Sequence, residues 1–531
     1  MTELVTANPP TIWCVGGTDS SGGAGVTRDL ATLADLGAHG CPIVTLVSAQ
    51  SHHAMLSSAA MQPSLINEQW LLLANDALPH CIKIGAIAND EQALVLIALI
   101  EMLDAPRPFI VWDPVLYSSS KGLLSELGKE TVKKLLCIVD LVTPNINELA
   151  SIAAITDIAV KVEIHCESDM RNAGRILINS GAKSVLVKGG HAHWQHHATD
   201  LFFTQGEEIA FSQPREKHSE IRGTGCMQAS AIAAFVAKGY CINDALTLAS
   251  AYVKSVRDIS VGLHPPSSLP LSQQNMPFVP KLAGFPQHRS TFPTVSFYGN
   301  SISTNANDDA GVKAYIGSHH SDISDESESH TKPFLPLLSY TRDIYPVVDS
   351  VDWIEALLPT GVTIIQLRIK ENDTACGNKR ISEQIQRAVA LTKDTSCQLF
   401  INDYWQLAIE HGAYGVHLGQ EDLFTADVEA IRAAGLRLGV STHGYAEIQR
   451  VKKLAPSYIA LGHIFATKTK DMPSKPQGIK RLKQYVDLCC NIPTVAIGGI
   501  NINRCKGVAD TGVTHIAVVS AITEARCSEE A

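Results

Sequence analysis

The chain has 531 residues, 45% of them hydrophobic and 18% charged, which is enough for two or three globular domains. A formal net charge of −10 argues against nucleic acid as the main partner, because phosphate backbones are bound by basic faces. Gly, Pro or charged residues interrupt each apolar stretch before it reaches the length of a membrane span, so we expect no membrane partner.

Thirteen cysteines are scattered through the chain without a CxxC pair. Such cysteines are typical of reduced, mostly buried thiols. The first residues, MTELVTANPP, contain no basic segment followed by an apolar one, so no secretory signal is visible. Both observations predict a cytoplasmic protein. The sequence leaves open whether the chain forms a homo-oligomer.

Residues 10–262 alternate between strand-like and helix-like runs. Helices on both faces of a parallel sheet produce this pattern. The expected strands are 11–17, 41–50, 82–87, 109–115, 141–145 and 184–190. The expected helices are 28–36, 91–103, 145–154, 168–180, 226–238 and 242–258. The first half is therefore predicted to be an α/β domain with three layers.

Two glycine-containing segments precede helices in this half. The glycine-rich turn, residues 16–25, follows the first strand and suits an anion or a polar ring, although a structural turn explains it equally well. Arg222-Gly223-Thr224-Gly225-Cys226 opens a later helix, where N–H groups and the helix dipole favour the oxygens of a phosphoryl group. We expect the dipole to lower the pKa of the Cys226 thiol, which could then accept a proton. The alternative is a small buried cysteine in a packed helix.

Charged groups follow three further strands at their carboxyl ends. Asp113 ends one strand, Asn145 and Glu148 follow the next, and Lys188 ends another. Carboxylates at such ends can hold Mg²⁺ beside nucleotide phosphates, and a lysine can pair with a phosphate. Taken singly, Glu148 could be a first-turn helix charge and Lys188 a solvated strand end. Their order along one sheet favours a nucleotide site.

The ordered series GGTDSSGGAG, VTLVSAQ, KIGAI, DPV, TPNINE, VKGG and GTGC resembles the hydroxymethylpyrimidine and phosphomethylpyrimidine kinases, which have the ribokinase-like fold. The resemblance implies that Asp19 and Gln50 contact the pyrimidine. It implies that ATP and Mg²⁺ are held by Asp113, Asn145, Glu148 and Lys188. The anion hole would be Gly223, Thr224 and Gly225, with Cys226 as the base. Ala86 replaces a usual Met, and Arg222 replaces a common His.

Residues from about 265 to 340 are rich in Pro, Ser and acidic residues. This composition buries little apolar surface and predicts a linker that is at least partly disordered. A small ordered piece is expected around Phe292 to Tyr298. The predicted division is a kinase domain over residues 1–264, the linker over 265–340 and a second domain over 341–531.

Eight short apolar runs follow between Asp343 and Ile522, most of them separated by segments with helical spacing. Alternating strands and helices indicate parallel strands, and eight repeats are enough to close a (β/α)₈ TIM barrel. The expected strands are IYPVV, TIIQL, QLFI, GVHL, RLGV, YIALGHIF, PTVAI and HIAVV. Active sites of such barrels lie at the carboxyl ends of the strands.

Polar residues occupy those ends in the predicted barrel. Gln366, Arg368 and Lys370 alternate along one strand and can grip a diphosphate. Asp403 and Asp422 end neighbouring strands and can share Mg²⁺, although Asp422 could be only a helix cap. Further anion-binding groups follow the fifth to eighth strands: Ser441, Thr442, Thr467, Thr469, Lys470, Gly498, Gly499 and Ser520.

The motifs QLRIK, IND, GVHLGQED, GVSTH, IFATKTK, AIGGI and VVSAIT resemble those of thiamine phosphate synthase, a TIM-barrel enzyme. The resemblance implies that the pyrimidine diphosphate is bound by Gln366, Arg368, Lys370 and Asn402, with Ser441 and Lys470 meeting its diphosphate and ring. Mg²⁺ would be held by Asp403 and Asp422. The thiazole phosphate would be held by Thr467, Thr469, Gly499, Val519 and Ser520.

The two resemblances are chemically consecutive, because the final product of the kinase is the substrate of the synthase. We therefore expect one bifunctional enzyme whose partners are small molecules: hydroxymethylpyrimidine and its phosphates, thiazole phosphate and ATP. One alternative is a pyridoxal-type or other alcohol kinase fused to an inactive barrel. Another is a module that senses thiamine precursors without catalysis.

Overall fold

A computed structural model of the full chain describes residues 8–51, 54–117, 122–156, 163–215, 221–261, 283–298, 332–338, 343–370, 375–467 and 475–524. The chain forms two compact units, residues 1–301 and 302–531.

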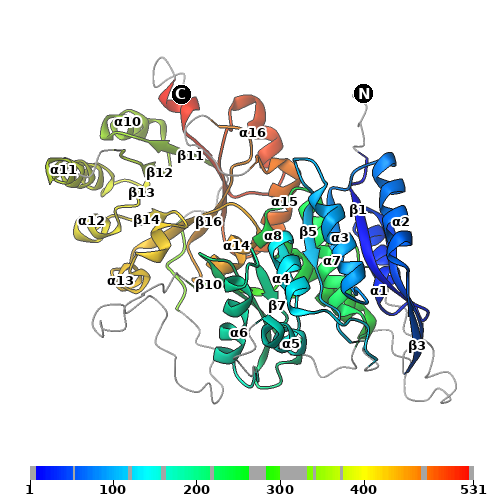
Figure 1. Cartoon of the computed structure of the whole chain (residues 1–531). Helices are drawn as coiled ribbons and strands as arrows, with labels where there is room; N and C mark the ends of the chain where they lie inside the picture. Colours follow the sequence, from blue (N-terminus) through cyan, green and yellow to red (C-terminus); the bar gives the residue numbers. More distant parts are fainter. Residues whose placement is uncertain are drawn as a thin grey trace, which may run out of the picture. The chain divides into compact units, whose positions relative to one another are not determined.

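The N-terminal unit is built on a ten-stranded sheet in the order β10-β9-β8-β7-β6-β5-β4-β1-β2-β3 (Figure 1). Its strands are β1 (Thr11–Asp19), β2 (His39–Gln50), β3 (Met55–Ala60), β4 (Cys81–Ile84), β5 (Phe109–Trp112), β6 (Leu141–Val142), β7 (Val185–Val187), β8 (His197–Phe203), β9 (Glu208–Pro214) and β10 (Thr294–Tyr298). The strands from β7 to β2 are parallel, as predicted. The expectation of an all-parallel sheet is wrong at both edges, where β3 and β8 to β10 are antiparallel.

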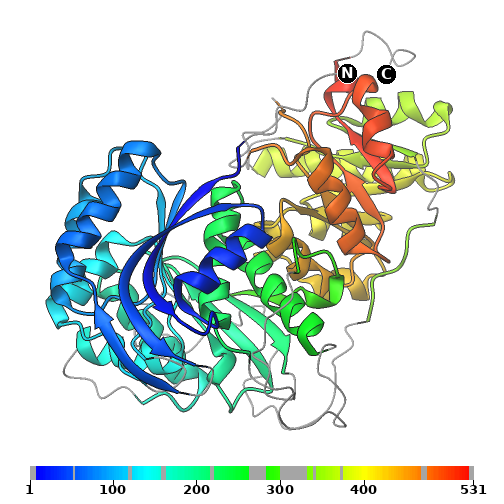
Figure 2. The same cartoon turned by 90° about the vertical axis from the view of Figure 1, so that its right-hand side faces the viewer.

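Helices cover both faces of this sheet (Figure 2). On one face α1 (Gly25–Asp35), α7 (Thr224–Ala237) and α8 (Ile242–Val261) pack together. On the other lie α2 (Pro63–Asp76), α3 (Asp90–Glu101), α4 (Lys129–Ile138), α5 (Ile146–Thr156) and α6 (Glu167–Asn179). Trp13 of β1 and Trp70 of α2 meet edge to face in the core, with ring centroids 4.9 Å apart. The predicted three-layer α/β/α fold is confirmed.

Two described parts of the predicted linker belong to these units. Strand β10 pairs with β9, which agrees with the ordered piece expected around Phe292 to Tyr298. Before it, the N–H groups of Ala283 and Gly284 donate to Asp35 Oδ2 at 2.9 and 3.0 Å. In the C-terminal unit, Phe334 and Leu337 are buried. The predictions for 265–282 and 299–331 lie outside the described residues, and the three domain boundaries stay predictions.

The C-terminal unit is a closed barrel of eight parallel strands in chain order, which confirms the predicted TIM-type fold. Its strands are β11 (Asp343–Val348), β12 (Ile364–Leu367), β13 (Gln398–Asn402), β14 (Gly415–Leu418), β15 (Arg437–Thr442), β16 (Tyr458–Leu461), β17 (Thr494–Ala496) and β18 (His515–Val518). The helices are α10 (Val351–Leu357), α11 (Ala375–Thr392), α12 (Trp405–Glu410), α13 (Val428–Ala433), α14 (Tyr445–Lys452), α15 (Gly478–Cys489), α16 (Ile502–Ala509) and α17 (Ser520–Thr523). Pairing of β11 with β18 closes the barrel.

Aromatic rings fill the barrel interior. Tyr345, Phe400 and Tyr458 are buried and meet edge to face, with centroids 5.1 to 6.2 Å apart. Glycines on neighbouring strands make room for them, because a Cβ on Gly415 would overlap the Phe400 ring and one on Gly439 the Tyr458 ring. The barrel is therefore a packed core whose free space lies at its ends.

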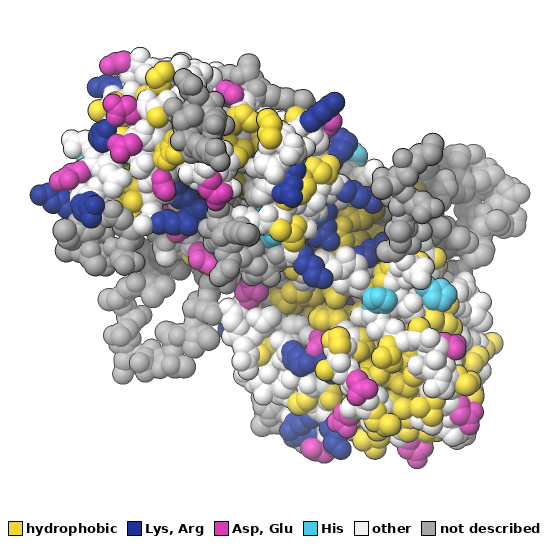
Figure 3. All heavy atoms as spheres, turned by 90° about the horizontal axis from the view of Figure 1, so that it is seen from above, with side chains coloured by type: hydrophobic (Ala, Val, Ile, Leu, Met, Phe, Trp, Pro, Cys, Tyr) yellow, Lys and Arg dark blue, Asp and Glu magenta, His cyan; other side chains and the backbone are white. Residues whose placement is uncertain are grey.

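The surface mixes both signs of charge. In the view of Figure 3, acidic and basic side chains are interspersed on both units, and hydrophobic side chains gather on the N-terminal one. Exposed large hydrophobic residues of that unit include Leu71 and Leu72 of α2 and Met102 after α3. No helix among the described residues is long and apolar enough to cross a membrane.

Candidate active sites

The start of α7, which is the predicted anion hole, packs against the glycine-rich turn. Gly223, the residue before the helix, has a left-handed backbone with φ of 73°. A Cβ at this position would overlap the carbonyl group of Gly23, so only glycine allows the approach. The buried Arg28 stabilises the glycine-rich turn, because its Nη2 group donates a hydrogen bond to the carbonyl of Gly22 at 3.3 Å. The first N–H groups of a long helix thus lie beside a fixed loop, as an anion site requires.

A cation and two carboxylates lie at the same edge of the sheet. Lys188 Nζ is 2.6 Å from Asp113 Oδ1 and 3.9 Å from Glu148 Oε2. A Cβ on Gly225 would lie 3.1 Å from the same ammonium nitrogen, so Lys188 reaches the start of α7. Its side chain is only 11% exposed, which rules out a solvated strand end. The predicted residues after β5, β6 and β7 therefore lie together beside the start of α7.

Asn145 and Glu148 also cap α5. The N–H of Asn145 donates to Glu148 Oε2 at 2.8 Å, and the N–H of Glu148 donates to Asn145 Oδ1 at 3.0 Å. Glu148 is thus a first-turn helix charge, as the structural alternative stated, and it also lies near Lys188. Burial raises the pKa of the Glu148 carboxyl to about 7, and Lys188 opposes this rise.

Cys226 is buried in the first turn of α7, and the predicted lowering of its pKa is wrong. Burial raises the pKa of the thiol to about 11, because the charged thiolate would lose its hydration. Lys83 lowers this pKa and Asp29 raises it again, both by smaller amounts. The N–H of Gly25 also favours the thiolate. In this structure Cys226 is a protonated thiol at neutral pH.

The predicted pyrimidine-binding residues lie at the ends of β1 and β2. Asp19 Oδ1 accepts from the N–H and the hydroxyl of Ser21 at 2.9 and 2.7 Å, so the glycine-rich turn fixes its carboxylate. Gln50 is joined to the same turn through Ser20, whose Oγ accepts from the Gln50 N–H at 2.8 Å. Arg222 Nη2 is 3.4 Å from Asp19 Oδ2.

A buried ion pair beneath these groups was not predicted. Lys83 Nζ of β4 is 2.9 Å from Asp29 Oδ2 of α1, and both side chains are almost fully buried. The Ser230 hydroxyl of α7 donates to the other oxygen of Asp29 at 2.8 Å. Asp29 raises the pKa of the Lys83 ammonium against the effect of burial. Together with Ser230, this ion pair links helices α1 and α7 to strand β4 of the sheet.

In the barrel, the predicted diphosphate-binding residues lie at the carboxyl ends of β12 and β13. Gln366 and Asn402 are buried, Arg368 is half-buried and Lys370 is exposed. Asn402 lies opposite His417 of the neighbouring strand β14. The charge of Arg368 lowers the pKa of the His417 imidazole, so Arg368 lies in the same region of the barrel as Asn402 and His417. The binding roles of Gln366, Arg368, Lys370 and Asn402 stay predictions.

The two predicted metal-binding carboxylates flank the end of β14. The N–H of Asp403 donates to the carbonyl of His417 at 3.0 Å, and Asp422 Oδ2 accepts from the N–H of Gly419 at 3.0 Å. Asp403 has a left-handed backbone with φ of 64°, which is uncommon outside glycine and occurs at functional turns. Asp422 is the first residue of a short 3-10 helix, residues 422–424, and its side chain binds the preceding turn instead of capping that helix. Among the described residues, no three His, Cys, Asp or Glu side chains gather into a metal site.

The predicted thiazole phosphate site is described in part. Gly499 has φ of 62°, and a Cβ on it would overlap the carbonyl of Ala466, so the turn after β17 packs on the loop that carries Thr467. Ser520 begins α17 after the neighbouring strand β18, with Val519 just before it. The predictions for Thr469 and Lys470 lie outside the described residues.

Comparisons with known proteins agree with both halves. The model of the phosphomethylpyrimidine kinase family matches residues 19–265, and that of the thiamine monophosphate synthase family matches residues 341–522. The thiamine-phosphate synthase of Serratia proteamaculans is 57% identical over 195 residues, which are 37% of this chain and 90% of that protein. The chain belongs to the thiamine-phosphate synthase family. The Proteus mirabilis member is 58% identical over 182 residues, or 34% of this chain and 83% of that protein.

Some solved structures are similar to part of this thiamine-phosphate synthase family member. A phosphomethylpyrimidine kinase from Clostridium difficile has 29% sequence identity and a TM-score of 0.38, with 46% of this chain and 97% of that chain covered. A Staphylococcus aureus pyridoxal kinase in complex with pyridoxal has 22% identity and a TM-score of 0.45, with 55% and 100% covered. Both predicted resemblances, to the kinase and to the synthase, are confirmed by the family matches.

His417 is a buried residue of the synthase barrel that the sequence argument did not select. Its Nε2 is 2.8 Å from Ser441 Oγ, and its Nδ1 is 2.8 Å from the Tyr458 hydroxyl. Burial lowers the pKa of the imidazole to about 3, and the charge of Arg368 lowers it further. The hydroxyl of Ser441, a predicted substrate-binding residue, is therefore hydrogen-bonded to the neutral imidazole of His417.

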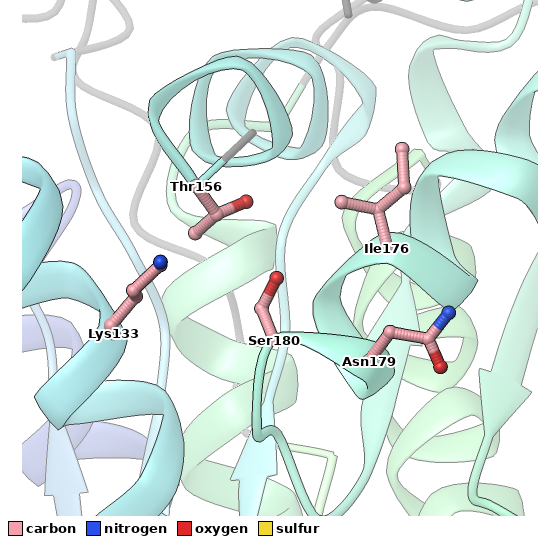
Figure 4. A pocket seen from close by; sticks show the side chains of 5 residues that line it. All are labelled: Lys133, Thr156, Ile176, Asn179 and Ser180. Carbon is pink, nitrogen blue, oxygen red and sulfur yellow. The ribbon is translucent and has the colours of Figure 1, made fainter. Parts of the chain in front are cut away.

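A surface depression of about 380 Å³ on the N-terminal unit is separate from these sites (Figure 4). Its lining residues come from α4, α5 and the end of α6: Lys133, Thr156, Ile176, Asn179 and Ser180. None of them is a predicted site residue. The depression therefore does not compete with the carboxyl edge of the sheet as the candidate site.

Proposed function

We propose that the chain is one bifunctional enzyme of thiamine synthesis. The N-terminal unit phosphorylates hydroxymethylpyrimidine with ATP, first to the monophosphate and then to the diphosphate. The barrel couples this diphosphate with thiazole phosphate and releases thiamine phosphate and diphosphate. The convergence of Lys188, Asp113 and the anion hole of α7 carries the kinase proposal. The 57% identity to a thiamine-phosphate synthase over nearly the whole of that protein supports the coupling.

In the kinase, the substrate oxygen attacks the γ-phosphorus of ATP, the bond from phosphorus to the bridging oxygen breaks, and ADP leaves. Cys226, in its thiolate form, accepts the proton of the substrate hydroxyl. The N–H groups of Gly223, Thr224 and Gly225 and the ammonium of Lys188 stabilise the charge that develops on the phosphoryl oxygens. Asp113 and Glu148 suit Mg²⁺, which binds one or two carboxylates together with substrate phosphates and would neutralise part of this charge.

In the barrel, the bond between the pyrimidine methylene carbon and the diphosphate oxygen breaks, and the thiazole nitrogen supplies the electron pair for the new carbon–nitrogen bond. Arg368, Lys370 and the Ser441 hydroxyl hold the departing diphosphate. The electron-rich aminopyrimidine bears the positive charge in between, so the reaction needs no protein nucleophile. Asp403 and Asp422 suit Mg²⁺, which would balance the leaving charge.

The partners of both units are then small molecules, and we propose the cytoplasm as the location. The cysteines among the described residues support a reducing compartment, because none of these eleven forms a disulfide bond.

The test uses the purified full chain with ATP, Mg²⁺, hydroxymethylpyrimidine and thiazole phosphate, with products followed by mass spectrometry. We expect magnesium-dependent thiamine phosphate. Cys226→Ala should stop phosphorylation but not coupling of supplied pyrimidine diphosphate, and Arg368→Ala should do the reverse. A chain that phosphorylates an alcohol but never couples supplied diphosphate would instead be a kinase with an inactive barrel.

A further inference from the structure

A continuous set of hydrogen bonds crosses the barrel between two predicted substrate-binding residues. Gln366 Nε2 is 3.4 Å from the Tyr345 hydroxyl, which is 2.8 Å from the Tyr458 hydroxyl. Tyr458 is 2.8 Å from His417 Nδ1, and His417 Nε2 is 2.8 Å from Ser441 Oγ. The five residues come from β12, β11, β16, β14 and β15. We call this set the barrel relay.

The barrel relay has one consistent direction of donation. An amide nitrogen only donates, so the Tyr345 hydroxyl accepts from Gln366. Among the described residues the Tyr458 oxygen is the acceptor in reach of the Tyr345 proton, so we assign the donation from Tyr345 to Tyr458. Tyr458 then donates to His417 Nδ1. A neutral imidazole carries one proton, which is therefore on Nε2 and is donated to Ser441 Oγ. The proton of Ser441 is left to point away from the ring.

The geometry also prevents the imidazole from turning. The rings of His417 and Tyr458 are stacked, with centroids 5.6 Å apart and planes 18° apart. His417 is 5% exposed, and Tyr345 and Tyr458 are at most 1% exposed, so water does not compete for these bonds. Buried hydroxyl groups without a partner are unfavourable, so each member enforces the direction of the next.

We propose that His417, oriented by Tyr458, is a positioning residue that makes Ser441 an obligatory hydrogen-bond donor to the pyrimidine diphosphate. This inference rests on the proposed function of the barrel. The ring nitrogens and phosphate oxygens of that substrate are acceptors, so a serine with a fixed donor direction matches them. A serine that could rotate freely would present a lone pair for part of the time and would bind the substrate less tightly.

The test compares Tyr458→Phe with the unmodified full chain. Removing the hydroxyl frees the tautomer of His417, and we expect the KM for hydroxymethylpyrimidine diphosphate to rise about 3- to 10-fold, the range of one hydrogen bond. In a Ser441→Ala background, Tyr458→Phe should change KM no further, because its effect passes through Ser441. Independent effects of the two substitutions would overturn the proposal.

Tyr414→Phe is the matched control. The Tyr414 hydroxyl is 2.8 Å from Gln398 Oε1, at the first residue of β13, and its ring packs on Phe400. This variant also loses a hydroxyl group at the barrel core, but at the end opposite the mouth. We expect an unchanged KM for the diphosphate, even if its melting temperature falls. An equal rise in KM would mean that any loosening of the barrel weakens binding, and would overturn the proposal.

Nitrogen NMR of the full chain labelled with ¹⁵N-histidine tests the direction without an activity assay. We expect the resonances of His417, assigned by their loss in His417→Gln, to show a protonated Nε2 and an unprotonated Nδ1. The opposite tautomer would overturn the proposal whether or not the variants fold. If the expected tautomer is present but no thiamine phosphate forms, the proposed function fails and the barrel relay remains.

Discussion

At Cys226, burial and the helix N-terminus act on the thiol in opposite directions. The sequence shows the position at the start of a helix, and this alone predicts a lowered pKa. It does not show that Cys226 itself is buried, and this burial raises the pKa of its thiol to about 11. The place of Cys226 in the first turn of a helix was thus predictable from the sequence, whereas its protonation state depends on packing from segments far away in the chain.

The raised pKa gives the kinase step a defined pH dependence. A base must be deprotonated, and a thiol with pKa near 11 is mostly protonated at neutral pH. We expect kcat/KM for hydroxymethylpyrimidine to rise about tenfold per pH unit from about pH 7 to about pH 9, since the thiolate fraction grows at that rate below the pKa. The measurement is a pH–rate profile. The Cys226→Ala variant should react slowly, with a kcat/KM that does not change with pH. A kcat/KM that does not change with pH in the unmodified chain would exclude Cys226 as the base.

Arg222 contacts Asp19, a predicted pyrimidine-binding residue. Its guanidinium is 3.4 Å from Asp19 and also donates to the carbonyl of Ser51. Arg222→Gln should leave Asp19 less firmly oriented and raise the KM for hydroxymethylpyrimidine about 3- to 10-fold, as loss of a charge-assisted contact predicts. Steady-state kinetics at saturating ATP measures this. The KM for ATP should not change, and a change in it would place Arg222 on the nucleotide instead.

Among the elements, the strands that form apolar runs beside functional motifs could be predicted from the sequence. The isolated strands at the edges of the N-terminal sheet could not. All eight barrel strands follow the predicted runs, because each is buried on both faces. Strand β3 was missed because its residues Ser57–Ala60 are small and exposed, without apolar alternation. The hairpin of β8 and β9 did carry a signal, since Gly206 separates two short apolar runs. The Lys83–Asp29 ion pair left no signal in the sequence, because the two residues are far apart along the chain.

That pair links β4, α1 and, through Ser230, α7. Lys83→Met would leave the Asp29 carboxylate buried without its partner, and we expect a loss of about 3–5 kcal/mol in local stability. Hydrogen exchange of α1 and α7 peptides, read by mass spectrometry, measures it. Lys83→Met combined with Asp29→Asn should lose less, because no buried charge remains. Unchanged exchange in the single variant would show that the pair does not hold the two helices.

Each active site of the whole molecule is built within one unit. The predicted kinase residues fall between Asp19 and Cys226, in one unit, and the predicted barrel residues fall between Gln366 and Ser520, in the other. The composition of the linker, rich in Pro, Ser and acid, predicts a connection that does not fix the distance between them. The pyrimidine diphosphate should therefore pass through solution.

This independence predicts complementation between two inactive chains. We expect Cys226→Ala to lack kinase activity and Arg368→Ala to lack coupling activity. A mixture of the two variants therefore contains one working kinase site and one working coupling site, on different molecules. We expect the mixture to form thiamine phosphate at the same steady-state rate as the unmodified chain at an equal concentration of each site, measured by mass spectrometry. Product from the unmodified chain, together with no product from the mixture, would show direct transfer of the intermediate between the two sites of one molecule. Because the two folds share no site residue, we expect free diffusion to suffice.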